Sequence, residues 1–322
     1  MGGIEHVSDG EGPSGAHSYR GLAVEEAIRA WSFESVWALL VDGEVGSPLP
    51  PAEAFPLPIR TGDHRVDMQA ALAGLAPVWG FTSLPTTSPA AARTSLARAS
   101  VMALSFLAQS ARGPDVPAVP DWVVDQVSGI ARRFLTRWLG EADERRVRAI
   151  NAGWVAIAAA PGCPSLEVAR HTAATGADIA ACLAAAVAAS SGPLVAGAAA
   201  RLAEVLTTAP GGAQVREFRR QWGFARRPSP HTSPQVEALE EVSREVGSEY
   251  KIVAAHAAEI AHYTHPRFPT EQLLTTLWVT HLFTFAGVPP RMLTAMFACG
   301  KTAGWSATIV TEHSRLLEKL NR

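Results

Sequence analysis

Apolar residues recur at helical spacing through most of the chain, and no segment shows the sustained alternation typical of β-strands. The strongest apolar run covers residues 172–200, where Ala, Val, Leu and Gly predominate and Asp178 is the only charged residue between 177 and 189. Small side chains let helices approach closely, so residues 177–189 predict a central helix that is buried on all sides. Ser190 to Pro193 should end this helix, which places the following junction deep in the molecule.

The same periodicity predicts helices on both sides of this run, and Ser32 or Ser35 is expected to cap the second half of the first one. Thr270 is expected to cap the helix that it begins. Segments rich in Pro and Gly separate the helices at 47–60, 114–120, 161–164 and 210–236, and residues 1–18 read as a loose arm or a short hairpin. The predicted class is all-α, with twelve or more helices; those outside the central run are predicted at 22–42, 66–76, 90–111, 121–140, 143–160, 165–174, 234–246, 250–264, 270–285, 291–297 and 301–320.

Composition narrows the functional classes. The chain has 322 residues, of which 48% are hydrophobic and 18% charged, with a formal net charge of −2. That balance gives no overall attraction to nucleic acid or to an anionic membrane. The first residues lack the apolar region of a signal peptide, and no strongly hydrophobic 18-residue run predicts a membrane span, so we expect a cytoplasmic protein. Cys163, Cys182 and Cys299 have no metal-binding spacing, and we expect buried thiols in a reducing compartment.

Four segments carry a resemblance to bacterial citrate synthases. They are YRGLAVEEAIRAWSFESVWALLVDGEVGSPLPPAE, RASVMALSFLAQSARGPDVPAVP, TGADIAACLAAAVAASSGPL and GVPPRMLTAMFACGKTAGW, and they keep the family's order over about residues 17–322. The resemblance implies the citrate synthase fold, an all-α homodimer with a large helical domain and a smaller mobile one. The large domain would comprise 1–195 and 288–322, and the small domain 196–287. The family's active site lies in the cleft between them and takes a small-molecule ligand.

The residues that carry the family's chemistry are replaced in this sequence. The three family histidines fall on Ala160, Val195 and Arg226, and the general-base carboxylate falls near Thr276. A thioester α-proton is weakly acidic, so a base and a hydrogen-bond donor for the enolate must act together. Valine and alanine side chains donate no hydrogen bond. The resemblance therefore implies a chain that does not make citrate.

At other family positions this sequence keeps the family's residue or its positive charge. Ser165 alone survives in the block around Ala160, Lys301 stands where the family has arginine, and Arg322 lies close to the position of the arginine that the partner subunit contributes. Residues 272–311 contain no Asp or Glu, and Glu271 would match the base only with about five residues inserted after it. The segment between 201 and 223 is shorter than usual, which weakens the expected CoA site, so a CoA thioester is at most a substrate and no cofactor is expected.

Each candidate ligand-binding residue also has a structural interpretation. His171 fits a capping or core role as well as a ligand-binding role, His231 fits a solvated loop, and His281 fits a satisfied core histidine. Arg226 and Arg227 fit a surface role as well as anion binding. The full candidate set is Ser165, Arg170, His171, Val195, Arg226, Arg227, His231, Lys301 and Arg322.

No metal site is expected. His256, Glu259 and His262 occur at three-residue intervals, which spreads them over about 120° of a helix surface at about 100° per residue. The pattern is not the HExxH motif of zinc enzymes.

Two functions remain open. One is a repurposed enzyme that uses the interdomain cleft for different chemistry on an anionic or acyl substrate. The other is a non-catalytic homologue, acting as a ligand sensor or as a regulatory partner of an intact citrate synthase. Retained cations favour the first, whereas the apolar replacements favour the second.

Overall fold

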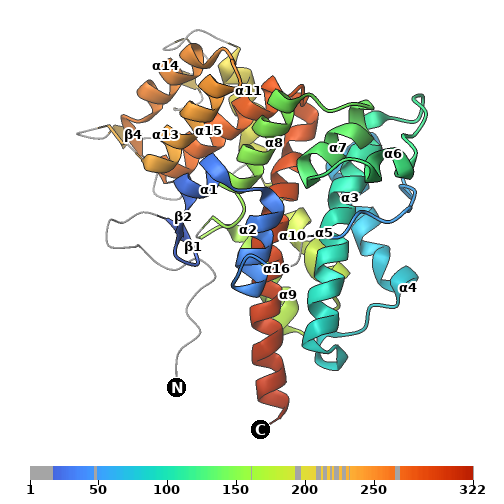
Figure 1. Cartoon of the computed structure of the whole chain (residues 1–322). Helices are drawn as coiled ribbons and strands as arrows, with labels where there is room; N and C mark the ends of the chain where they lie inside the picture. Colours follow the sequence, from blue (N-terminus) through green and yellow to red (C-terminus); the bar gives the residue numbers. More distant parts are fainter. Residues whose placement is uncertain are drawn as a thin grey trace.

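A computed structural model describes residues 17–46, 49–160, 162–192, 197–207, 212, 216–217, 220, 225–226, 230–231, 233–264 and 269–321. Helices dominate these residues, which confirms the all-α prediction (Figure 1). The strands of the described residues form two short antiparallel pairs. β1 (Ser18–Tyr19) pairs with β2 (Leu22–Ala23), and β3 (Ala225–Arg226) pairs with β4 (Tyr263–Thr264).

Most helices of the first half follow the predicted segments with shifted ends, but the single helix predicted over 121–140 is wrong, because residues 126–129 separate two helices there. The helices of the first half are α1 (Val24–Ala30), α2 (Phe33–Asp42), α3 (His64–Ala73), α4 (Leu75–Trp79), the 3₁₀ turn η1 (Leu84–Thr86), α5 (Pro89–Arg112), α6 (Asp121–Asp125), α7 (Ile130–Leu139) and α8 (Glu144–Ala156). The second half contributes α9 (Pro164–Ala174), α10 (Ile179–Ser190), α11 (Gly197–Leu206), α13 (Pro234–Glu245), α14 (Tyr250–Ile260), α15 (Thr270–Phe285), the 3₁₀ turn η2 (Pro290–Met292) and α16 (Leu293–Leu320).

The predicted helix over 22–42 is two helices preceded by a hairpin. Ser32 lies between α1 and α2, and its hydroxyl accepts a hydrogen bond from the Ser35 backbone N–H, so the predicted cap is Ser32. The hairpin turns at Arg20 and Gly21, both with positive φ, as a tight two-residue turn requires. Residues 1–16, on which most of the predicted arm or hairpin falls, lie outside the described residues.

The C-terminal helices predicted at 291–297 and 301–320 are one continuous helix, so the predicted break is wrong. Gly300 lies inside α16 instead of ending a helix. A Cβ atom at Gly300 would lie 2.8 Å from Cγ1 of Ile157 and 3.0 Å from Cδ1 of Trp154. The glycine therefore allows close packing against the end of α8, a reason that sequence spacing does not distinguish from helix termination.

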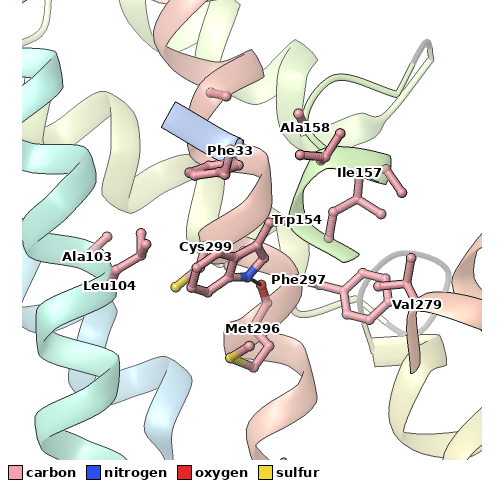
Figure 2. Packing of buried hydrophobic residues seen from close by; sticks show 14 of the residues in the cluster. Phe33, Ala103, Leu104, Trp154, Ile157, Ala158, Val279, Met296, Phe297 and Cys299 are labelled. Carbon is pink, nitrogen blue, oxygen red and sulfur yellow. Dashed lines mark hydrogen bonds between the residues drawn. The ribbon is translucent and has the colours of Figure 1, made fainter. Parts of the chain in front are cut away.

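α16 is the central helix of the molecule, and we call its position the axis. It packs against α2, α5, α9 and α10 and against the C-terminal part of α8, and Figure 1 shows it running through the centre of the fold. Trp154 of α8 is fully buried against it and donates its indole N–H to the Met296 carbonyl at 3.1 Å. Figure 2 shows this contact among Phe33, Phe297 and Cys299.

The helix predicted to be buried on all sides is buried on most of its surface only. α10 begins at Ile179, with the Asp178 side chain accepting a hydrogen bond from the Ala181 backbone N–H, and it packs on α9, α3 and α16. Ala181, Ala185, Ala188 and Ala189 are partly exposed, so the prediction of complete burial is wrong. Small side chains mark close packing, but they do not tell how many sides of a helix are covered.

The helices between residues 197 and 285 pack on one another and on the rest of the core. α15 contacts α11, α13 and α14, and it also packs against α8. Thr270 does not cap α15, because Pro269 occupies the N-cap position and the Thr270 hydroxyl donates to the Tyr263 carbonyl. In the described part of the chain, no helix has both the length and the apolar character needed to cross a membrane.

Candidate active site

A buried lysine meets a buried cysteine where α16 passes the start of α9. Lys301 lies in the middle of α16 and not at the predicted helix start, and it is 8% exposed. Its ammonium donates a hydrogen bond to Sγ of Cys163 at 3.3 Å. Cys163 is the N-cap residue of α9 and is 1% exposed. An ammonium group carries three N–H donors, so this contact leaves two of them for other acceptors.

Ser165 also lies where Cys163 and Lys301 meet, a place that we call the corner of α9 and α16. Its hydroxyl lies 3.2 Å from Sγ of Cys163 and accepts the indole N–H of Trp305 at 3.1 Å. Trp305 lies four residues after Lys301, so both side chains leave the same face of α16. Ser165 is fully buried. The one residue that the family block shares with this chain is therefore a structural link between α9 and α16.

Gly304 brings the segment after α8 against this corner. Its backbone N–H donates to the Ala158 carbonyl at 2.9 Å, and a Cβ atom at Gly304 would lie 2.5 Å from that oxygen. Residues 158–160 thus lie along α16 beside Lys301. Ala160, which is partly exposed, ends this segment.

The positive charge of Lys301 acts on the Cys163 thiol. Burial on its own raises the pKa of the Cys163 thiol, but the positive charge of Lys301 and hydrogen bonds from Ser165 offset it, and the pKa is lowered. Cys182 differs, because burial raises its pKa to about 12. Burial also raises the pKa of Cys299, which lies beside the Met68 thioether. The three thiols are free and buried, as predicted, and Cys163 alone has a lowered pKa.

A second polar group lies near the Ala159 backbone. Glu271, in the first turn of α15, accepts a hydrogen bond from the Ser233 hydroxyl. His17 is close enough to Glu271 and to the Ala159 backbone for both to raise its pKa, although burial is the larger effect and the net pKa is lowered. The His17 ring stacks edge-on against Tyr19, with ring centroids 5.3 Å apart. His17 therefore lies near both Glu271 and the Ala159 backbone, in the segment that Gly304 of α16 contacts through Ala158.

The remaining family positions have structural partners. Thr276 is buried in α15 and its hydroxyl donates to the Gln272 carbonyl at 2.7 Å, so this side chain is part of its own helix. Gln235 stands where the resemblance places an arginine of the family, and its side-chain amide donates to the Ala156 carbonyl at 3.0 Å. Neither side chain can act as the carboxylate base of the family.

Arg170 and His171 face away from this corner. Arg170 pairs with Glu167 at 2.5 Å, and Nδ1 of the exposed His171 lies 2.7 Å from the Glu167 carbonyl oxygen. Glu312 also raises the pKa of Arg170, after the larger effect of the Glu167 hydrogen bond. Glu312 lies eleven residues after Lys301, about 16 Å further along α16. The structure therefore does not bring this pair of candidates to Lys301.

The other candidates are only partly described. Arg226 is exposed in β3, opposite Tyr263 of β4. His231 donates its backbone N–H to the Ala261 carbonyl, and its Nε2 atom is buried without a hydrogen-bond partner among the described residues. Val195, Arg227 and Arg322 lie outside the described residues.

The remaining histidines have structural positions. His281 lies 2.8 Å from the Ser248 hydroxyl, and burial lowers its pKa to about 4, as a satisfied core histidine requires. His256 is fully buried in α14, whereas His262 is exposed beyond its end. Over the described ranges, no cluster of three His, Cys, Asp or Glu side chains is arranged to hold a metal ion.

Sequence reasoning missed three residues of this region. His17 falls in a polar segment that reads as a loose arm, and Cys163 reads as an ordinary buried thiol. Glu271 lies five residues from the expected family position. A helical repeat gives no signal for contacts such as Cys163 to Lys301, which joins residues 138 positions apart.

The fold and the quoted motifs define a citrate-synthase-like protein, and comparison with known proteins agrees. The family model for the citrate synthase C-terminal domain matches residues 4–322, so the chain belongs to the citrate synthase family. Proteins named "Putative citrate synthase 2" from Mycobacterium tuberculosis and Mycobacterium bovis are 42% identical over 322 residues, covering 96% of this chain and 86% of theirs.

Solved structures support the same fold. The citrate synthase of Thermotoga maritima matches with a TM-score of 0.69 and 20% identity, covering 97% of this chain and 89% of that one. The enzyme of Pyrobaculum aerophilum matches with a TM-score of 0.67 and 21% identity, covering 97% and 86%. A third match, with a TM-score of 0.69, 18% identity and 96% and 89% coverage, is the Thermoplasma acidophilum enzyme in complex with carboxymethyl coenzyme A and oxaloacetate.

Proposed function

We propose that this member of the family does not make citrate and is a repurposed enzyme. It uses the cleft between the large domain, 1–195 with 288–322, and the small domain, 196–287, to act on an anionic or acyl substrate. A CoA thioester belongs to the candidate substrates.

The loss of citrate formation rests on the replaced groups. Ala160 offers no hydrogen bond, and the hydroxyl of Thr276 is engaged within α15. No carboxylate occurs in residues 272–311 to replace the family's base. Removing one positioned acid or base commonly costs a factor of about 10²–10⁴ in rate, and several are missing here.

Lys301 carries the proposal of a retained anion site. An ammonium group buried to this degree is costly unless negative charge or strong acceptors compensate it. No carboxylate of the described residues forms an ion pair with Lys301, and its hydrogen bond to Cys163 uses one of three donors. A substrate carboxylate at this position would supply the missing acceptors.

His17 and Glu271 are the groups that we assign to acid–base chemistry. His17 lies near both Glu271 and the Ala159 backbone, and neither side chain is one that the resemblance assigns to the family's chemistry. Glu271 is positioned by Ser233, and His17 by Tyr19. A repurposed reaction would use this pair where the family uses its aspartate and histidines.

Ligand-induced stabilisation tests the proposal. The purified chain is heated with oxaloacetate, other keto acids, apolar carboxylic acids or acyl-CoAs, and the melting temperature is followed. We expect at least one anion to raise it, Lys301→Met to abolish the rise, and Lys301→Arg to retain part of it. Citrate formation from acetyl-CoA and oxaloacetate should stay at the background rate. Measurable citrate turnover, or an anion effect that Lys301→Met leaves intact, would contradict this function.

A non-catalytic role as a sensor or regulatory partner is the second candidate. It is favoured by Ala160 and Thr276, where a polar reactive group has been lost without a replacement at the same position. An anion that stabilises the chain but is not converted by it, in any combination of the substrates above, would support this second function.

A further inference from the structure

The contact between Cys163 and Lys301 could also support a reaction between the two side chains, which anion binding does not require. Sγ and Nζ are 3.3 Å apart, and both side chains are at least nine-tenths buried. The Ser165 hydroxyl fixes Sγ from a second side at 3.2 Å. A nucleophilic sulfur and a primary amine are thus held in contact in a fixed orientation, which favours a reaction between them.

The surroundings prepare this sulfur for oxidation. The thiolate is the form that reacts with peroxides, and cysteines beside a cation or at a helix N-terminus are the reactive ones. Cys163 has both features, since Lys301 contacts it and α9 begins at the next residue. Cys182 and Cys299 are buried without a cationic neighbour that lowers their pKa, so they serve as internal controls.

We propose that a peroxide converts Cys163 and Lys301 into a reversible sulfur–nitrogen cross-link. The thiolate attacks one peroxide oxygen, an S–O bond forms, the O–O bond breaks, and the leaving hydroxide takes a proton to become water. Sulfur is oxidised by two electrons to sulfenic acid and the peroxide is reduced.

The second step joins the two side chains. The hydroxide released in the first step takes its proton from the Lys301 ammonium, which leaves a neutral amine beside the sulfenic acid. The amine attacks sulfur, an S–N bond forms, the S–O bond breaks, and the departing hydroxide takes a proton from nitrogen to become a second water. One thiol, one amine and one hydrogen peroxide thus yield the cross-link and two waters. Two equivalents of an added thiol reverse the reaction and form a disulfide.

The cross-link would switch off the anion site, because the nitrogen of Lys301 no longer presents an ammonium. This consequence rests on the proposed function, whereas formation of the cross-link does not. The chain would then bind its anionic ligand only under reducing conditions.

Peptide mass spectrometry of the full chain tests the cross-link. The reduced protein is treated with hydrogen peroxide, denatured in acid and digested. We expect the Cys163 peptide joined to the Lys301 peptide, with a mass two hydrogens below their sum, and loss of this species after dithiothreitol. The Cys182 and Cys299 peptides should be unchanged. Separate peptides, with Cys163 unmodified or carrying only added oxygen, would overturn the proposal.

Lys301→Arg is the matched variant. It keeps a positive charge beside Cys163 but replaces the amine with a poorly nucleophilic guanidinium. We expect it to give no joined peptide and to accumulate a sulfenic acid that a dimedone probe captures. A joined peptide in this variant would overturn the assignment to Lys301. The wild-type mass measurement stands by itself if the variant does not fold.

Ligand binding separates this inference from the proposed function. Peroxide should abolish the anion-induced rise in melting temperature of the wild type, dithiothreitol should restore it, and Cys163→Ala should retain the rise in peroxide. An anion effect in untreated protein without a cross-link overturns the inference alone. A cross-link without any anion effect leaves the inference standing and contradicts the proposed function.

Discussion

Gly304 sets how closely α16 approaches the segment that carries Ala160. A Cβ atom at this position would lie 2.5 Å from the Ala158 carbonyl oxygen, which is backbone and cannot rotate away. We expect Gly304→Ala to lower the free energy of unfolding by about 1–3 kcal/mol, since overpacking forces the two elements apart. Urea denaturation monitored by circular dichroism measures this loss.

Gly74 provides a control for the Gly304→Ala substitution. It has an αR conformation between α3 and α4, and an added Cβ would meet the Ala71 carbonyl oxygen at 3.4 Å, an ordinary contact. Gly74→Ala should therefore leave stability unchanged or raise it by up to about 1 kcal/mol. Equal destabilisation by both substitutions would show that close packing at Gly304 is not the cause.

The candidate site shows which of its residues can be predicted from the sequence alone. Lys301 and Ser165 could be named from the sequence because they match family positions. Their partner Cys163 could not, since its reactivity comes from a lysine on another helix. His17 and Glu271 likewise become candidates only because the fold brings them close to each other. Contacts between side chains of different elements cannot be predicted from the helical periodicity of the sequence.

At the scale of elements, a buried polar network fixes α3 to α5. Asp67 of α3 accepts hydrogen bonds from the Ser110 hydroxyl of α5 at 2.7 Å and from the Thr61 backbone N–H at 2.6 Å. His64 lies 2.9 Å from the same Ser110 hydroxyl. Asp67 is 2% exposed. The network joins two helices and the turn that precedes α3.

Acid should weaken this link. Burial is the largest influence on Asp67 and raises its pKa, but hydrogen bonds from Ser110 and Thr61 together outweigh it and the pKa is lowered. The folded state then binds this proton less tightly than the unfolded chain. The contribution of Asp67 is complete above the ordinary aspartate pKa and is lost as pH falls through the lowered value.

We expect Asp67→Asn to destabilise the protein at neutral pH by about 1–3 kcal/mol, because the amide replaces an acceptor with a donor in a buried network. The variant should also lose part of the wild type's fall in stability between neutral and acid pH. Denaturation curves across that range measure both effects. Asp63→Asn is the control, since Asp63 caps α3 and asparagine caps equally well. An unchanged acid dependence in Asp67→Asn would contradict the role of this carboxylate.

Helix prediction succeeded where the apolar periodicity continues over many residues. It failed where a glycine could either end a helix or allow close packing inside one. α5, α9, α13 and α15 follow their predicted segments closely. The predicted break between 297 and 301 contains Gly300, which instead lies inside α16 in close contact with Ile157. The apolar α10 was read as the centre of the fold, yet α16, which has a more mixed composition, occupies that position.

At the scale of the whole molecule, family membership leads us to expect a homodimer. The partly exposed alanines of α10 lie on one helix face, at 181, 185, 188 and 189, and offer a flat surface for a second copy. Light scattering should therefore give about twice the mass of the 34.0 kDa chain. A stable monomer at micromolar concentration would contradict this expectation.

Two charge substitutions locate that interface. Ala185→Glu would bury a charge between copies of α10 and should give a monomer. Ala258→Glu, on the exposed face of α14, should leave the dimer intact. A dimer that survives Ala185→Glu would place the interface elsewhere on the surface.

The position of α16 also affects the order in which the protein can fold during its synthesis. Residues 293–320 leave the ribosome after all of the helices that surround them, so α2, α5, α9 and α10 face an unfilled axis until then. N-terminal regions generally begin to fold while translation continues. Here the nascent chain exposes the apolar surfaces around that axis until its final helix arrives, so cells must protect the unfinished polypeptide from aggregation for most of its translation.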